Sequence, residues 1–181
     1  MQALLVLALA GCGGADRTES ESDDRDTRLA EVQQVLREGG PEPALVLVEK
    51  VGRLFGEDGE TLALKGHILH RLEKFEQAVA TFDASLKIEP TGELHLDRAI
   101  SLTALQRHEE AEAALAAAEA MFTERLEGRS YDVVLKLHMA MIAHLRGNDQ
   151  SALDQINLII AEHPDSSAAR ELKAEVQRSI N

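Results

Sequence analysis

The segment Gly59–Gly92 reads GETLALKGHILHRLEKFEQAVATFDASLKIEPTG, and its landmarks set the fold. Gly66 lies inside an apolar helical pattern, where glycine costs about 1 kcal/mol relative to alanine. A glycine is expected there if a paired helix passes so close that a methyl group would clash, and Ala78 meets the same need on the second helix. Glu73-Lys74 is the predicted turn, and Pro90 ends the second helix because proline cannot continue one. The segment is therefore predicted to form two closely packed helices.

The same pattern recurs along the chain. The small residue of the second helix appears at intervals of 34, 33 and 41 residues, as Ala44, Ala78, Ala111 and Ala152. A period near 34 residues indicates stacked helix pairs. The longer third interval predicts an extended helix before Tyr131. Residues 166–180 form a further amphipathic helix, as expected of a cap that shields the last pair, with apolar positions at Ala169, Leu172, Val176 and Ile180.

These landmarks resemble the tetratricopeptide repeat (TPR). Leu62 stands at the place of the family's Trp and Leu69 at that of its Tyr, and the repeat-defining residues are Ala44, Gly66, Ala78, Phe82, Pro90, Ala111, Ala152 and Pro164. Leu115 and Ile156 take the place that Phe82 has in the clearest unit. The resemblance implies an all-α fold, a right-handed superhelix of antiparallel helix pairs with about four TPR-like units and a C-terminal capping helix. The alternative is a helical bundle whose alanines recur by chance.

Composition limits the classes of partner. The chain of 181 residues has 32 acidic and 19 basic side chains, a formal net charge of −13, which would repel a polyanion, so we expect no nucleic-acid partner. Aromatic residues make up 3% of the chain, which favours a core of Leu, Ala, Val and Ile in packed helices. No run of about 20 apolar residues follows the N-terminus, so no membrane-spanning helix is expected.

The single cysteine, Cys12, follows an apolar run from Ala3 to Ala10. That run matches the apolar centre of a secretory signal. The residues Leu9, Ala10, Gly11 and Cys12 resemble the lipobox of bacterial lipoproteins, which implies that Cys12 receives a diacylglyceryl group and becomes the mature N-terminus. In Gram-negative lipoproteins, an Asp directly after the cysteine is the usual signal for retention in the inner membrane. Gly13 stands at that position here, so the resemblance implies a protein anchored in the outer membrane and facing the periplasm. The alternative is that this run is an ordinary apolar helix and Cys12 a chance thiol.

The stretch after the cysteine reads GGADRTESESDDRD and has no apolar periodicity, which predicts a disordered acidic tether. The expected organisation is therefore a signal peptide over residues 1–11, a lipidated Cys12 with its tether over 12–26, and a TPR-like repeat domain with its cap helix over 27–181.

The resemblance to TPR proteins also implies a binding groove, because the first helices of a stacked array line a concave face that binds peptides. The expected groove residues are Leu29, Gln33, Leu36, Arg37, Ala63, His67, His70, Arg71, Leu96, Ile100, Thr103, Leu137, Met141 and His144. An apolar face with Arg and His suits an aliphatic segment with an acidic end. The alternative is that some of these residues pack inside the array. Arg37 and Arg71 resemble part of the clamp by which chaperone-binding members grip a carboxylate, but the Asn members are missing.

No catalytic pattern is present in the sequence. His67 and His70 are three residues apart and could meet on one helix face, but no further ligand completes a metal set. Phosphate-binding glycine loops, nucleophile elbows and dinucleotide fingerprints do not occur. We therefore expect no enzymatic activity, no cofactor and no metal.

The sequence thus favours a lipid-anchored, non-enzymatic scaffold of the bacterial envelope that binds other envelope proteins or peptide segments, for secretion, pilus or envelope assembly or as an adaptor of cell-wall enzymes. The membrane is contacted through the lipid anchor only. Two alternatives remain: a soluble cytoplasmic TPR co-chaperone or regulatory adaptor whose N-terminus is not a lipoprotein signal, and a metal-dependent enzyme that would need His67 or His70.

Overall fold

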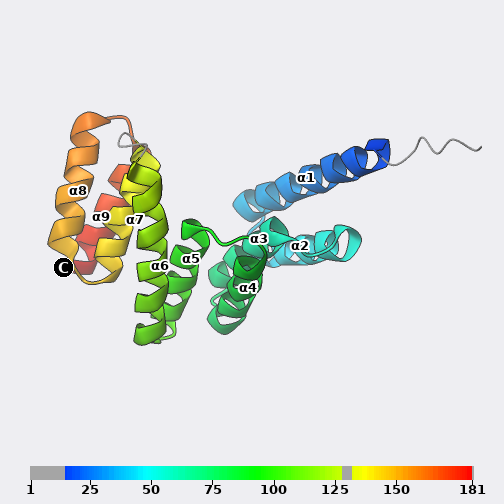
Figure 1. Ribbon diagram of the computed structural model, residues 1–181, viewed down its shortest axis with the longest axis horizontal. Coiled ribbons are helices and arrows are strands. Elements are labelled where there is room, and N and C mark those ends of the chain that lie inside the picture. Colours follow the sequence, from blue (N-terminus) through cyan, green and yellow to red (C-terminus); the bar gives the residue numbers. More distant parts are fainter. Residues whose placement is uncertain (1–14, 128–131, 181) are drawn as a thin grey trace, which may run out of the picture. The chain divides into compact units, whose positions relative to one another are not determined.

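The computed structural model describes residues 15–127 and 132–180, and all regular secondary structure in these ranges is helical (Figure 1). The helices are α1 (Ala15–Glu38), α2 (Pro41–Phe55), α3 (Gly59–Arg71), α4 (Phe75–Ile88), α5 (Gly92–Ala104), α6 (His108–Glu127), α7 (Val133–Leu145), α8 (Asp149–Glu162) and α9 (Ser167–Ile180). The all-α class predicted from the sequence is confirmed. The chain forms two compact units, and the boundary between them falls between Glu57 and Asp58 in the sequence.

The first unit is the helix pair α1–α2. The irregular tether expected up to Asp26 is instead helical from Ala15 onward. Charged side chains three and four apart support this helix, because the Arg28 guanidinium lies 3.1 Å from Glu31 and 3.9 Å from Asp24. Residues 12–14 of the tether lie outside the described residues.

The second unit, from Asp58 onward, repeats one local design in three helix pairs. Asp58, Thr91 and Asp132 precede α3, α5 and α7, and the side chain of each accepts a hydrogen bond from a backbone N–H two or three residues later. A side-chain acceptor at this position satisfies one of the donors that a helix start leaves open. The three pairs therefore begin in the same way.

The turns inside the three pairs are also alike. Glu73, Gln106 and Gly147 adopt φ values of 59°, 58° and 76°. The next residue in each turn donates its backbone N–H to a carbonyl five residues earlier: Lys74 to Leu69, Arg107 to Leu102, and Asn148 to Ala143. This is the hydrogen bond of the Schellman motif, which ends a helix with one left-handed residue. The predicted turn at Glu73-Lys74 is thus one of three copies.

Close contacts between the paired helices explain the small residues. The aromatic ring of Phe82 on α4 lies against Gly66, where a methyl group would come within 2.5 Å of a ring carbon. Phe122 on α6 lies in the same way against Gly92. The recurring alanines of the second helices are all buried: Ala44, Ala78, Ala111 and Ala152.

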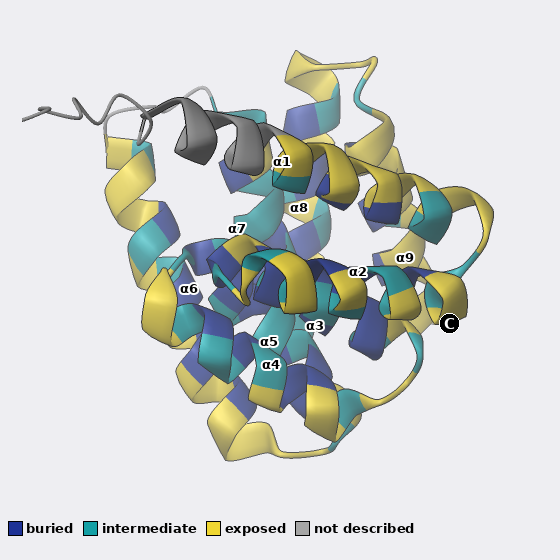
Figure 2. Ribbon diagram, turned by 90° about the vertical axis from the view of Figure 1, so that its right-hand side faces the viewer, coloured by how far each residue is buried: buried dark blue, intermediate teal, exposed yellow. Residues whose placement is uncertain are grey.

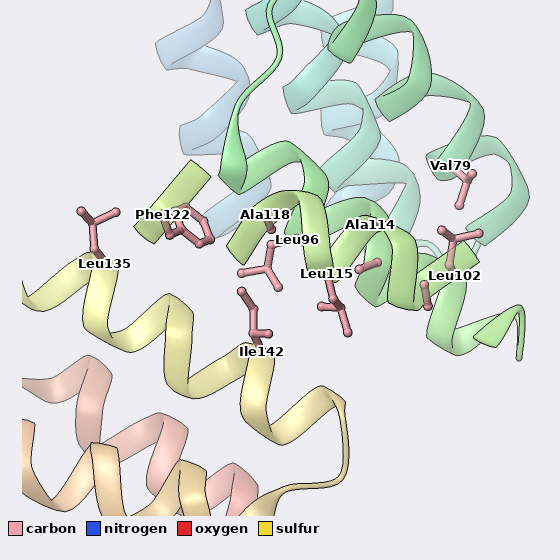
Figure 3. Packing of buried hydrophobic residues seen from close by; sticks show 11 residues of the cluster. Val79, Leu96, Leu102, Ala114, Leu115, Ala118, Phe122, Leu135 and Ile142 are labelled. Atoms are coloured by element: carbon pink, nitrogen blue, oxygen red, sulfur yellow. The ribbon is translucent and has the colours of Figure 1, made fainter. Parts of the chain in front are cut away.

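Two apolar clusters hold the later pairs together. One joins α4, α5, α6 and α7 through residues such as Val79, Phe122 and Leu135, and Figure 3 shows these side chains in the cluster. The other joins α7 and α8 to α9. Ala169, Leu172 and Val176 of α9 are buried there, whereas Ile180 is 54% exposed and does not complete the cap as expected. Figure 2 shows the exposed outer residues of α9.

Candidate partner-binding face

The first helices of successive pairs contact one another within the second unit, α3 against α5 and α5 against α7. Six expected groove residues on α3 and α5 remain at least partly accessible, and we call them the α3–α5 face: Ala63, His67, His70, Arg71, Ile100 and Thr103. The helical period places these residues along one side of each helix, because positions three and four apart share a face. The structure therefore brings this part of the predicted set together.

His67 is bound to the next repeat by an acidic side chain. Its Nε2 lies 3.4 Å from Oδ2 of Asp97 on α5, and its ring meets Phe82 edge-on at 5.5 Å between centroids. Burial raises the pKa of the Asp97 carboxyl; the His67 imidazole acts against this rise and Glu93 adds to it. The pair places one half-buried carboxylate of α5 beside one exposed imidazole of α3.

His70 makes a second link to α5. Its Nδ1 lies 2.9 Å from Oγ of Ser101, and that hydroxyl donates to the carbonyl of Asp97 at 3.1 Å. Because the hydroxyl proton is used in this way, Nδ1 of His70 is the donor to Oγ. Burial, and then the proximity of His67, lowers the pKa of His70. The imidazole is thus held neutral and oriented at neutral pH.

The structure removes two residues from the predicted groove. Leu29 is 2% exposed and Leu96 is 4% exposed, so both belong to the core and a partner cannot reach them. The sequence period places them correctly on first helices, but the neighbouring helices cover them. The other expected residues of the first unit are accessible: Gln33 and Arg37 are exposed and Leu36 is half-buried.

The predicted groove residues of α7 serve mainly in packing. Leu137 and Met141 are partly buried against the apolar cluster of α7, α8 and α9. His144 points its Nδ1 to Oδ1 of Asp149 at the start of α8, 2.6 Å away, and its side chain is 15% exposed. The packing alternative for this helix is therefore the better description.

Two polar residues that organise the face, Asp97 and Ser101, were missed in the sequence. Both lie on α5 and contact the two histidines of α3, about 30 positions earlier. The repeat period could have indicated them, because residues one period apart in a stacked array face neighbouring helices. Neither residue belongs to a recognisable sequence motif, so their contacts with the two histidines are seen only when α3 and α5 pack together.

The described residues do not provide a metal-binding cluster of three or more His, Cys, Asp or Glu. No helix within the described ranges is both long and apolar enough to cross a membrane. The expected lipobox, Leu9, Ala10, Gly11 and Cys12, lies outside the described residues, so lipidation stays a prediction. The face offers imidazole, guanidinium and aliphatic contacts, which suit binding.

Comparison with known proteins supports the repeat assignment. Residues 59–91 match the family model for the tetratricopeptide repeat. This repeat is typical of proteins that act as scaffolds for protein–protein interaction, and the match indicates no catalytic family. No curated protein matches the chain significantly.

Several solved structures share the fold at low sequence identity. TTC0263, a thermophilic TPR protein of Thermus thermophilus, is 18% identical with a TM-score of 0.66, over 87% of this chain and 83% of its own. A fragment of MamA from Desulfovibrio magneticus RS-1 is 18% identical with a TM-score of 0.54, over 87% and 85%. YrrB, described as a TPR protein with an unusual peptide-binding site, is 17% identical with a TM-score of 0.51, over 92% and 84%. These similarities define the class of fold as TPR-like helix pairs.

Proposed function

We propose that this protein is a non-enzymatic scaffold that binds a segment of a partner protein on the α3–α5 face. The observation that carries the proposal is that His67 and Arg71 of α3 are exposed on one face beside the partly accessible Ala63, while Ile100 of α5, on the adjacent first helix, is partly buried against the core. Aliphatic and cationic groups on one face suit an aliphatic segment with an acidic end. The peptide-binding site in the description of YrrB supports the same kind of role.

We further propose that the scaffold is anchored in the bacterial cell envelope through a lipid on Cys12, with the repeats facing the periplasm. The support is the sequence from Leu9 to Cys12 and the polar segment that follows it. Several acyl chains at one anchor would hold the protein firmly, since each buried methylene contributes about 0.8 kcal/mol. The partners in this proposal are other envelope proteins.

Chemical cross-linking in the native cell, followed by capture on a C-terminal tag, tests the binding face. Arg71→Glu is compared with Lys87→Glu, because both positions are exposed, lie in the same repeat and undergo the same charge change. We expect a defined envelope partner that is lost with Arg71→Glu and retained with Lys87→Glu. Equal capture by the two variants would contradict the proposed face.

The anchor has a separate test. The intact mass of the membrane form should show loss of Met1–Gly11 and the gain of a lipid, and Cys12→Ser should release the protein from the membrane. An unprocessed chain that captures only cytoplasmic proteins would instead support the cytoplasmic adaptor.

A further inference from the structure

The first unit carries a hollow that the proposed function does not use. It lies between α1 and α2 and has a volume of about 130 Å³. Its apolar lining is Val32, Leu47, Val51, Leu54 and Phe55, and its charged lining is Asp24, Arg28, Glu31 and Lys50. All of these residues belong to the α1–α2 pair.

Two large apolar side chains of α2, Val46 and Leu54, are exposed, and Leu54 also lines the hollow. Val46 is 64% exposed and Leu54 is 63% exposed, and Lys50 lies between them at the four-residue spacing of one helix face. Both helices of this pair carry exposed residues along their outer sides (Figure 2). A single helix pair of a repeat array cannot bury all of its apolar side chains, so a neighbour that covers Val46 and Leu54 would gain apolar burial.

The charges around the hollow are unevenly shared between its two helices. On α1, the carboxylates of Asp24 and Glu31 share the one guanidinium of Arg28, which leaves a net charge of −1. On α2, Lys50 makes no ion pair with any described residue. The hollow is therefore lined by a net acidic group on α1 and by a basic side chain on α2.

We propose that this surface binds a second copy of the chain, as a two-fold symmetric dimer through the α1–α2 pair. If the two-fold axis runs parallel to the helices, α1 of one copy packs against α2 of the other. Rotation about that axis keeps each residue at the same position along it, so the two copies meet in register. Lys50 of each copy then meets the acidic side formed by Asp24 and Glu31 of the other, and Leu54 of each copy enters the opposite hollow. The same contact is made twice, so charge and apolar surface are complementary without a different partner.

Sedimentation velocity of the full chain under reducing conditions, from about 1 to 200 µM, tests the dimer. We expect a monomer–dimer equilibrium that Leu54→Glu weakens at least tenfold. Leu158→Glu is the matched control, because Leu158 on α8 is 58% exposed and lies outside the hollow, and it should leave the dimer unchanged. Circular dichroism at 222 nm checks that both variants keep their helices.

A charge exchange distinguishes this interface from a general loss of stability. Lys50→Glu should weaken the dimer, and adding Glu31→Lys in the same chain should restore it, since the two charges then meet in reverse. A chain that stays monomeric over the whole concentration range, a dimer insensitive to Leu54→Glu, or a double variant no better than Lys50→Glu would each overturn the proposal. These results do not depend on the partner of the α3–α5 face.

Discussion

Replacement of Gly66 by alanine should destabilise the second unit, although alanine is the better helix former. A methyl group at Gly66 would lie 2.5, 2.7 and 2.9 Å from three ring carbons of Phe82. The ring is 1% exposed and meets His67 on its edge, so it has little room to move away. Overpacking of this kind costs up to about 3 kcal/mol, and the gain in helix propensity returns about 1 kcal/mol. The expected net loss is about 2 kcal/mol.

Urea denaturation followed by circular dichroism at 222 nm measures this loss. With a slope near 2 kcal/mol per molar urea, the midpoint should fall by about 1 M. Gly52→Ala in α2 is the control, because a methyl group there would meet mainly the flexible side chain of Glu57, at 3.0 Å. This control should be neutral or slightly stabilising.

A double-mutant cycle with Phe82→Leu identifies the cause. Leucine leaves space above residue 66, so Gly66→Ala in that background should cost nothing or gain up to about 1 kcal/mol. The reasoning is refuted if Gly66→Ala is as stable as the natural chain, or if its cost is the same with Leu at position 82.

Three further changes have defined outcomes. Burial raises the pKa of the Asp97 carboxyl, so the folded state loses stability as pH rises through that pKa. The free energy of unfolding of Asp97→Asn, measured by urea titration relative to the natural chain, should therefore increase from pH 4 to pH 7. Burial lowers the pKa of His138, whose ring stacks on Phe122, so protonation of the imidazole favours unfolding. The melting temperature of His138→Leu should therefore rise relative to that of the natural chain as the pH falls from 7 to 5. Arg146 lies 2.7 Å from Glu119, and Arg146→Gln should cost about 1 kcal/mol, less in 0.5 M salt, where screening already weakens the pair.

The local design of each repeat could be predicted from the sequence. Gly66 in a helical pattern, Ala78 one helix later and a proline after the second helix are requirements of close packing between neighbours in the chain. Helix starts at Asp58 and Thr91 follow from side chains that can accept a backbone hydrogen bond. These signals depend on residues within about 30 positions of each other, so they are visible without the tertiary structure.

The tertiary structure decided which residues are accessible and which polar groups meet. Leu29 and Leu96 have the correct period for a groove, yet neighbouring helices bury them. Asp97 reaches His67 because α3 and α5 pack side by side, and no motif marks that contact. Helical periodicity fixes the direction of a side chain around its own axis, whereas burial and charge pairing depend on how close the next helix comes. For this reason the sequence by itself determined the repeats of this protein, and only the packing of those repeats determined its candidate binding face.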